Sequence, residues 1–401
     1  MAMPSVNPQI LKWARETAGM SPEAAASKLG INDTRKLSGA VRVNALEEGQ
    51  TEPTEAILRK MSKVYRRPLL AFYLPVPPRA DESSHDFRTL PQRSSRDEPV
   101  IAALLRDVKT RQSLVRAMLE EEDHPKLDFV GAMAGSRSRS DVLGSIVETT
   151  GISLQEFRSL KTPELAFSYL RQKLEAIGVF VVLLGNLGTH HTNIDVSAFR
   201  GIALSDPLAP FIIINDQDAK PAWSFTLLHE ASHIWLGESG ISAFASELES
   251  ERFCNEVASA FLLPNEELIE LNVPPLSSTA AISEYISRFA SPRNLSMTMV
   301  AYRLYSSGKL SFDQWTTLAD HFRAEWRRQK ESEKEARKAK ESEGGPSYYM
   351  VRRHRLGKAL LDAAHRGITE GTLSATKAGK ILGVAPRSVY PLLNSANGRA
   401  A

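Results

Sequence analysis

The stretch "SFTLLHEASHIWLGESG", from Ser224 to Gly240, is the most informative part of the sequence. Its apolar residues surround two histidines in a helix-like pattern, and Gly237 is a typical helix stop. On a helix, His229 and His233 lie one turn apart on one face, the spacing at which two imidazoles can share a metal ion. Glu230 stands beside the first histidine, where a carboxylate can act as a general base. The alternative is a surface helix with two histidines that have ordinary hydrogen-bond partners.

Length and composition are those of a globular chain with more than one domain. The 401 residues are enough for two or three domains. Cys254 is the single cysteine, so no intramolecular disulfide can form, which fits a reducing compartment. The N-terminal residues lack the apolar core of a secretion signal, and the longest apolar runs, "VFVVLL" and "FIII", are too short to span a membrane. We therefore expect a cytoplasmic protein with no membrane partner.

The net charge of +3 is distributed unevenly along the chain. Residues 1–80 hold 12 Lys and Arg against 7 Asp and Glu, and residues 347–401 hold 9 against 2. The middle, residues 81–346, holds 29 against 38. Basic ends suit an acidic partner such as nucleic acid, and the acidic centre does not. The alternative is that both ends are solvated helical surfaces.

Residues 1–74 are predicted to form a bundle of short helices. Asn7 and Pro8 begin the first helix, Ser21 and Pro22 begin the second, and Gly30 ends it. A third predicted helix covers "EAILRKMSKVYRRPLLAFYL". This pattern, with "EEGQTEPT" after the presumed recognition helix, resembles the Xre-type helix-turn-helix domain.

The segment between "LG" and "EEG" departs from that family pattern. It is longer than usual and contains Gly39, so we expect a recognition helix that is displaced or broken. The resemblance implies DNA binding through this segment. Its candidate DNA contacts are Arg35, Lys36 and Arg42.

The remaining chain divides into four predicted segments. Residues 75–99, rich in proline, serine and charge, are a linker. Residues 100–326 hold helices, then strands at 179–184, 201–206 and 210–216, then the histidine-bearing helix and further helices. Residues 327–346 are a mixed-charge, partly helical linker, and residues 347–401 a basic helical segment. In that last segment "AGKILGVAPRSVYPLL" weakly resembles a second helix-turn-helix with Gly383 at the turn, and a small docking bundle is the alternative.

A third metal ligand is expected on the helix "ASELESERFCNEVASAFLLP", because a catalytic zinc site normally has three protein ligands. Glu251 can return to the first helix through an antiparallel turn. Asn255 lies one turn further on the same face, where it can orient a ligand histidine. The competing carboxylates are Glu247, Glu249 and Glu256.

These motifs together resemble the ImmA/IrrE family of bacterial zinc metallopeptidases. The matching elements are "FIIIN", the H-E-x-x-H helix, and an E-x-x-x-N-x-x-A helix that ends near "LLP". The resemblance implies an α+β, mostly helical fold with a zincin-like peptidase domain, a small sheet and an N-terminal helix-turn-helix domain. It also implies that His229, His233 and Glu251 hold Zn²⁺, or Mn²⁺, that Glu230 is the base, and that Asn255 supports a ligand.

The peptidase chemistry needs further groups. The strand "PFIIIND", with Ile213, Ile214 and Asn215, is predicted to pair with an extended substrate. Five residues are candidate oxyanion donors, and the sequence does not choose among them: His190, His191, Tyr285, Tyr302 and Arg303. Cys254 is predicted to be a small buried core residue, and a role as a further ligand is the alternative.

Two functions remain open. The first is a metal-dependent endopeptidase that cleaves a specific regulatory protein, and the resemblance implies a repressor-like substrate. The second is an antitoxin and transcriptional regulator that binds a neighbouring toxin and its own operator DNA, with the peptidase-like domain as a scaffold. The complete H-E-x-x-H pattern favours the enzyme.

Overall fold

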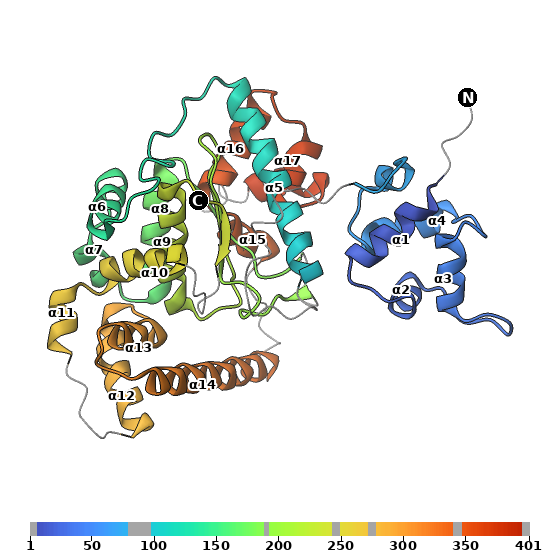
Figure 1. Cartoon of the computed structure of the whole chain (residues 1–401). Helices are drawn as coiled ribbons and strands as arrows, with labels where there is room; N and C mark the ends of the chain where they lie inside the picture. Colours follow the sequence, from blue (N-terminus) through green and yellow to red (C-terminus); the bar gives the residue numbers. More distant parts are fainter. Residues whose placement is uncertain are drawn as a thin grey trace. The chain divides into compact units, whose positions relative to one another are not determined.

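The computed structural model describes residues 6–78, 98–187, 192–242, 249–271, 278–339 and 347–394. The chain consists of two units, Met1–Val108 and Lys109–Ala401. Both are mainly helical, and the second contains a four-stranded sheet, which confirms the predicted fold class (Figure 1). A search of the described ranges finds no helix with the length and apolar character needed to cross a membrane.

The first unit is built from short capped helices around one apolar core. Asn7 and Ser21 cap the first two helices, each is followed by proline, and Gly30 ends the second helix in the left-handed conformation. These features confirm the predicted helix starts and stop. The elements are α1 (Pro8–Thr17), α2 (Pro22–Leu29), α3 (Gly39–Glu47), α4 (Glu55–Val64) and the 3-10 helix η1 (Leu69–Tyr73).

The last predicted helix of this unit is wrong in its length. It was expected to run to Leu74, but α4 ends at Val64. Arg66 has a positive φ of 54°, and Pro68 cannot continue a helix, so the chain restarts in η1.

Helix α3, at the place of the recognition helix, is intact, so of the two expectations that of a broken helix is wrong and that of a displaced helix stays a prediction. Ser38 caps it by accepting a hydrogen bond from the Val41 N–H at 3.3 Å, and Gly39 is its first residue. A Cβ at Gly39 would lie 2.3 Å from the Ile31 carbonyl oxygen, so the close approach of the preceding loop requires glycine there. The extra residues therefore lie in the connection 30–38, before the helix.

The sheet of the second unit has the strand order β1-β3-β2-β4. β1 pairs with β3 in parallel, β2 pairs with β3 antiparallel, and β2 pairs with β4 antiparallel. The first three strands confirm the predicted strands, and the short β4 was not predicted. The strands are β1 (Phe180–Leu183), β2 (Gly201–Leu204), β3 (Phe211–Ile214) and β4 (Gly240–Ser242).

Helix α9 (Lys220–Leu236) lies against β2 and β3 and is flanked by α8 and α10 (Figure 1). Trp235 on α9 and Phe167 on α8 are fully buried in the core that these elements share. This arrangement places one helix between a sheet and two helices, so nearly all its side chains are buried. The helices that precede or follow α9 here are α5 (Glu98–Glu121), α6 (Arg139–Thr150), α7 (Leu154–Ser159), α8 (Pro163–Ala176), α10 (Glu249–Leu262) and α11 (Asn265–Glu270).

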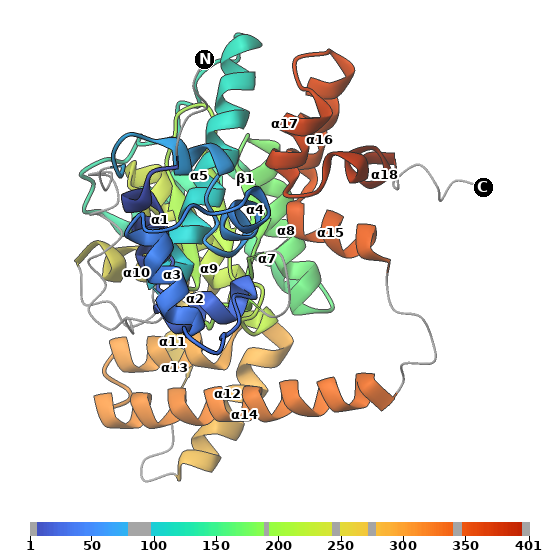
Figure 2. The ribbon, with the colours of Figure 1, turned by 90° about the vertical axis from the view of Figure 1, so that its right-hand side faces the viewer.

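Helix α14 (Phe312–Ala339) packs along α12 (Thr279–Ala290) and α13 (Met297–Ser306), as Figure 2 shows. It passes without interruption through residue 327, where the charged linker was expected to begin. The structure therefore places the first part of that predicted linker within a continuous helix.

The C-terminal helices are anchored to the rest of the second unit. The buried Arg171 of α8 donates hydrogen bonds to the carbonyl oxygens of Val181, His354 and Arg355, and so joins β1 to the C-terminal segment. Arg355 also forms an ion pair with Asp216 at 2.7 Å. The helices are α15 (Tyr348–Leu356), α16 (Lys358–Thr369), α17 (Ala375–Leu382) and α18 (Val389–Asn394), with the 3-10 helix η5 (Pro386–Ser388) directly before α18.

Candidate metal centre

Helix α9 is mainly apolar, and its ionisable buried side chains are those of the H-E-x-x-H motif. Every residue from Ala222 to Trp235 is buried, so His229, Glu230 and His233 lie in the protein interior. A helix that is apolar on all sides is typical of a core, and buried polar groups in it need partners. The surface-helix alternative for the two histidines is therefore wrong.

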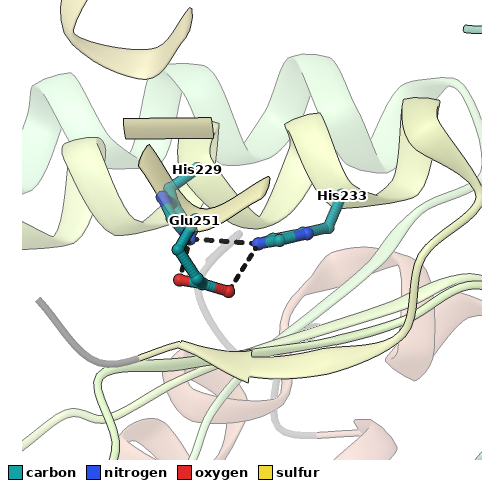
Figure 3. Close-up of side chains that lie close together, drawn as sticks. All are labelled: His229, His233 and Glu251. Carbon is teal, nitrogen blue, oxygen red and sulfur yellow. Dashed lines mark hydrogen bonds and ion pairs between the residues drawn. The ribbon is translucent and has the colours of Figure 1, made fainter. Parts of the chain in front are cut away.

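His229, His233 and Glu251 converge on one point between α9 and α10, as Figure 3 shows. The two Nε2 atoms are 3.2 Å apart. The two carboxylate oxygens of Glu251 lie 3.3 Å from the Nε2 of His229 and 3.2 Å from the Nε2 of His233. Within the described ranges this is the one group of three such side chains whose ligand atoms lie within 4.8 Å of one another.

The donor set fits a divalent metal ion. Two imidazole nitrogens and a carboxylate oxygen are the ligand types that zinc takes in catalytic sites with three protein ligands. Two facing ring nitrogens also need a shared cation or a proton between them, because neutral lone pairs repel each other. These three residues would hold the ion, and a further position would remain for water or substrate.

The other carboxylates considered for the third ligand lie elsewhere. Glu256 forms an ion pair with Arg139 at 2.8 Å, and Glu249 is exposed at the start of α10. Glu247 falls outside the described residues. Glu251 is the carboxylate of α10 that meets both histidines.

Without an ion, the cluster favours an ionised Glu251, a neutral His229 and a charged His233. Burial by itself would raise the pKa of Glu251, but hydrogen bonds from His229 and His233 hold it at about 2. Burial lowers the pKa of His229, which outweighs the opposing hydrogen bond to Glu251. Burial by itself would lower the pKa of His233, but the contacts with Cys254, Glu238 and Glu251 raise it well above its ordinary value, so a bound cation would displace that proton. A carboxylate and a neutral imidazole are the protonation states that bind a metal.

Two further side chains of α10 lie beside the ligand positions. Asn255, buried one turn after Glu251, hydrogen-bonds His229, and its role in supporting a metal ligand stays a prediction. Cys254 is completely buried beside His233, and burial raises the pKa of its thiol, which matches a neutral core residue.

Glu238 is a neighbour that the sequence reasoning missed. Its Oε2 lies 3.1 Å from the Nδ1 of His233, on the side of the ring opposite Glu251. Gly237, in the left-handed conformation, ends α9 and turns the chain back toward the helix. The Glu238 N–H then donates a hydrogen bond to the His233 carbonyl oxygen at 2.9 Å. The sequence feature that could have indicated it is an acidic residue directly after Gly237, the glycine that ends the helix. Such a carboxylate orients a ligand histidine and increases its basicity.

The side chain of Glu230 lies against strand β2. It is completely buried, and a Cβ at Gly201 of β2 would lie 2.0 Å from its Oε1. The absence of a side chain at Gly201 is what gives the carboxylate its position beside β2.

The predicted substrate-binding strand is wrong. Ile213 and Ile214 belong to β3, which is paired on both edges, with β1 and with β2. A strand with two partners has no free main-chain groups for a substrate. Asn215 is completely buried, and its side-chain amide donates to the carbonyl oxygens of Ile194 and Phe199 at 3.2 and 3.0 Å. Its contacts therefore fix the loop before β2.

The contacts that the structure gives for the three described candidate oxyanion donors are with residues other than the metal-binding side chains. Arg303 donates to the side-chain oxygen of Asn265 at 2.7 Å and to the Leu263 carbonyl, which holds the end of α10. Tyr302 packs edge-on against Trp315. Tyr285 packs on the core of the second unit, and both His190 and His191 lie outside the described residues.

The candidate DNA contacts of the first unit are exposed. Arg35 and Lys36 lie in the long connection before α3, and Arg42 lies in its first turn, where it donates to the Asn32 carbonyl at 2.9 Å. Their exposure leaves them accessible, and their role in binding DNA stays a prediction.

Comparison with known protein families finds two matches that lie in different units. Residues 11–72 match the helix-turn-helix family model, and residues 186–305 match the peptidase M78 model, the IrrE N-terminal-like domain. Searches of curated proteins and of solved structures return no significant match. The second matched range contains His229, Glu230, His233 and Glu251. The chain thus carries an N-terminal helix-turn-helix domain followed by an ImmA/IrrE-type, peptidase M78 domain.

Proposed function

We propose that the second unit is a zinc-dependent endopeptidase that cleaves a specific regulatory protein. The observation that carries this proposal is the convergence of His229, His233 and Glu251 in a buried cluster, on a helix that also carries Glu230. The peptidase M78 match to this region supports it. Zinc is the preferred ion because the donor set is two imidazoles and one carboxylate, and manganese is the alternative.

The outer strand β4 is the proposed binding edge for the substrate. It pairs with β2 on one side, and it is the terminal strand in the order of the described sheet. It directly follows α9, four residues after the last helical residue, Leu236. An extended peptide can therefore add to this edge through main-chain hydrogen bonds and lie along the metal-binding side chains. This strand replaces β3, which has no free edge.

The proposed hydrolysis needs a general base and a cation that acts on the scissile carbonyl group. A bound zinc ion would polarise the scissile carbonyl and lower the pKa of a coordinated water. Glu230 removes the proton of the attacking water and delivers it to the leaving amine, which balances the hydrolysis of one peptide bond. His229, His233 and Glu251 hold their positions through α9, α10 and the contact of His233 with Glu238.

The substitution Glu230→Gln tests this proposal. Purified wild type and variant, both loaded with zinc, are incubated with a lysate of cells that lack the gene, and new N-termini are labelled and identified by mass spectrometry. We expect specific new N-termini with the wild type and a loss of about 10²–10⁴-fold in their rate of formation with the variant, at equal zinc content. Identical cleavage by both proteins, or none by the zinc-loaded wild type, contradicts the enzyme proposal.

A regulator that binds a toxin and operator DNA is the second candidate function. The helix-turn-helix match over residues 11–72 favours it, because that domain type binds DNA. In this case complex formation and DNA binding survive Glu230→Gln, and no cleavage accompanies them. The same pair of proteins therefore separates the two functions.

A further inference from the structure

Residues near the C-terminal end of the described chain have the geometry of a helix-turn-helix, outside both matched ranges. Helix α17 ends at Leu382, the residues Gly383, Val384 and Ala385 form the turn, and η5 continues directly into α18. A turn of three or four residues that contains glycine is typical of the motif. By contrast, the connection between α2 and α3 covers residues 30–38.

Two glycines make this tight turn sterically feasible. Gly383 has a left-handed φ of 60°. A Cβ at Gly379 would lie 2.8 Å from the Val384 carbonyl oxygen, so the start of the second helical segment packs directly on the backbone of α17. Val389 and Leu392 of α18 are completely buried. The two segments therefore form one packed structure rather than two independent helices.

Helix α15 holds both ends of this structure. Arg352 donates to the carbonyl oxygens of Leu382 and Gly383 at 2.8 and 2.7 Å, and Arg353 donates to the Leu392 carbonyl at 2.8 Å. These bonds satisfy carbonyl groups at the C-terminal ends of α17 and α18. The helix-turn-helix is thus supported by α15, and α17 also packs on α16.

The second helical segment, Pro386–Asn394, presents one exposed face. Arg387, Tyr390, Pro391 and Asn394 are exposed and follow each other at spacings of three, one and three residues, which places them on one side of a helix. Arginine and asparagine are the side chains that most often read guanine and adenine in the major groove. A tyrosine on the same face can add phosphate or base contacts.

The segment that carries this face has an excess of basic residues, of which Arg355 and Arg366 pair with Asp216 and Glu122 outside it. Residues 347–401 hold 9 Lys and Arg against 2 Asp and Glu. Lys377 and Lys380 on α17 are exposed, and the acidic Asp362 is already paired with Lys358. Glu370 is the other acidic residue of the segment. This excess favours a polyanion over a protein surface, because the exposed face of Pro386–Asn394 has Tyr390 as its only large apolar side chain.

We propose that α17 and the segment Pro386–Asn394 form a second helix-turn-helix, which binds double-stranded DNA with Arg387, Tyr390 and Asn394 in the major groove. The chain then has a DNA-binding element on each side of the peptidase domain. This inference is independent of the peptidase activity, because it involves none of the residues of the metal centre.

The test uses the full chain and a fluorescent DNA duplex of about 30 base pairs with randomised sequence, long enough for several turns of the groove. Binding is followed by fluorescence anisotropy at low salt for the wild type, Arg387→Glu and Arg328→Glu. Arg328 is an exposed arginine of α14, so Arg328→Glu changes the net charge by the same amount as Arg387→Glu and serves as the matched control. Circular dichroism melting of both variants checks that each is folded.

We expect Arg387→Glu to weaken binding about tenfold or more, and Arg328→Glu to weaken it no more than about twofold. Tyr390→Ala should also weaken binding, by several-fold. An RNA duplex of the same sequence should bind more weakly, because its major groove is too narrow for a helix. Three results would each overturn the proposal: equal binding by Arg387→Glu and Arg328→Glu, no binding by the wild type, or a preference for the RNA duplex. The exposed face of Pro386–Asn394 would then be assigned to a protein partner.

Discussion

Each unit buries a cluster of ionisable side chains, and the two clusters differ in whether their hydrogen bonds are complete. In the first unit Arg15 donates from Nε and Nη2 to both oxygens of Glu47, at 2.7 and 2.8 Å, and from Nη1 to the Met20 carbonyl at 2.7 Å. The guanidinium and the carboxylate saturate each other.

In the second unit, two imidazole nitrogens and a carboxylate converge on one point, with the ring nitrogens facing each other at 3.2 Å. Such an arrangement needs a cation or a proton between the two ring nitrogens. The difference teaches that burial of charge alone does not mark a functional site. A saturated pair such as Arg15–Glu47 maintains the fold, and a convergent set of ligand atoms indicates a bound ion.

The largest expected effect comes from removing one converging ligand. His233→Ala should reduce the metal content from about one zinc ion per chain to a small fraction, because two protein ligands rarely retain zinc. Mass spectrometry of the purified proteins measures this content. His321→Ala, which alters a partly exposed histidine of α14, is the matched control and should keep the metal. Equal zinc in both variants would contradict the assignment of the cluster as a metal site.

The next effect concerns the saturated pair. Arg15→Ala leaves the buried Glu47 carboxylate without its partner, so we expect the first unit to lose about 3–5 kcal/mol of stability. Urea denaturation followed by hydrogen exchange in α1–α4 measures the free energy of unfolding of this unit. The double substitution Arg15→Met with Glu47→Leu should recover most of that loss, because it removes both charges. Failure of the double variant to recover would mean that the pair has a role beyond filling the core.

The metal site was largely predictable from the sequence, because helical spacing alone places His229 and His233 on one face. The choice of Glu251 needed the resemblance to a family, since four carboxylates were available in that region. The structure brings Glu251 to the histidines through the packing of α10 on α9, which no local pattern encodes.

The predictions that failed depend on long-range pairing. The order β1-β3-β2-β4 makes β3 an inner strand, and an apolar run such as "FIII" does not reveal which strand is at the edge. The three-residue β4 is too short to give a sequence pattern. In the first unit, Gly39 was expected inside a broken helix, and it lies instead at the beginning of an intact one because Ile31 approaches it closely.

A smaller effect is expected from the side chain behind a ligand. Glu238→Ala removes the carboxylate at 3.1 Å from the Nδ1 of His233, so we expect zinc affinity to fall by about 10–100-fold. Competition with a zinc-binding dye measures the change. Glu249→Ala removes an exposed carboxylate at the start of α10 and should leave the affinity unchanged. A similar loss in both variants would point to a general effect of acidic charge near the site.

The smallest effect tests whether the position of Glu230 depends on the strand beneath it. A methyl group at Gly201 would lie 2.0 Å from the Oε1 of Glu230, so Gly201→Ala must displace the carboxylate. We expect His229, His233 and Glu251 to keep their positions. We expect cleavage to slow by about tenfold or more at unchanged zinc content, because small misplacement of a reacting group is costly. The rate of appearance of new N-termini measures this loss.

Gly240→Ala is the matched control for this displacement. A Cβ at Gly240 of β4 meets no atom of the described residues within 4 Å, so the substitution adds the same methyl group to the same sheet without touching Glu230. Equal rates in the two variants would show that the carboxylate tolerates the displacement, and a loss of zinc in Gly201→Ala would show that the base and the ligands move together. Slower cleavage in Gly201→Ala alone, with zinc retained, would separate the two tasks that we propose for α9. In that case His229 and His233 hold the ion independently of β2. Glu230 depends on the lack of a side chain at Gly201 for its position.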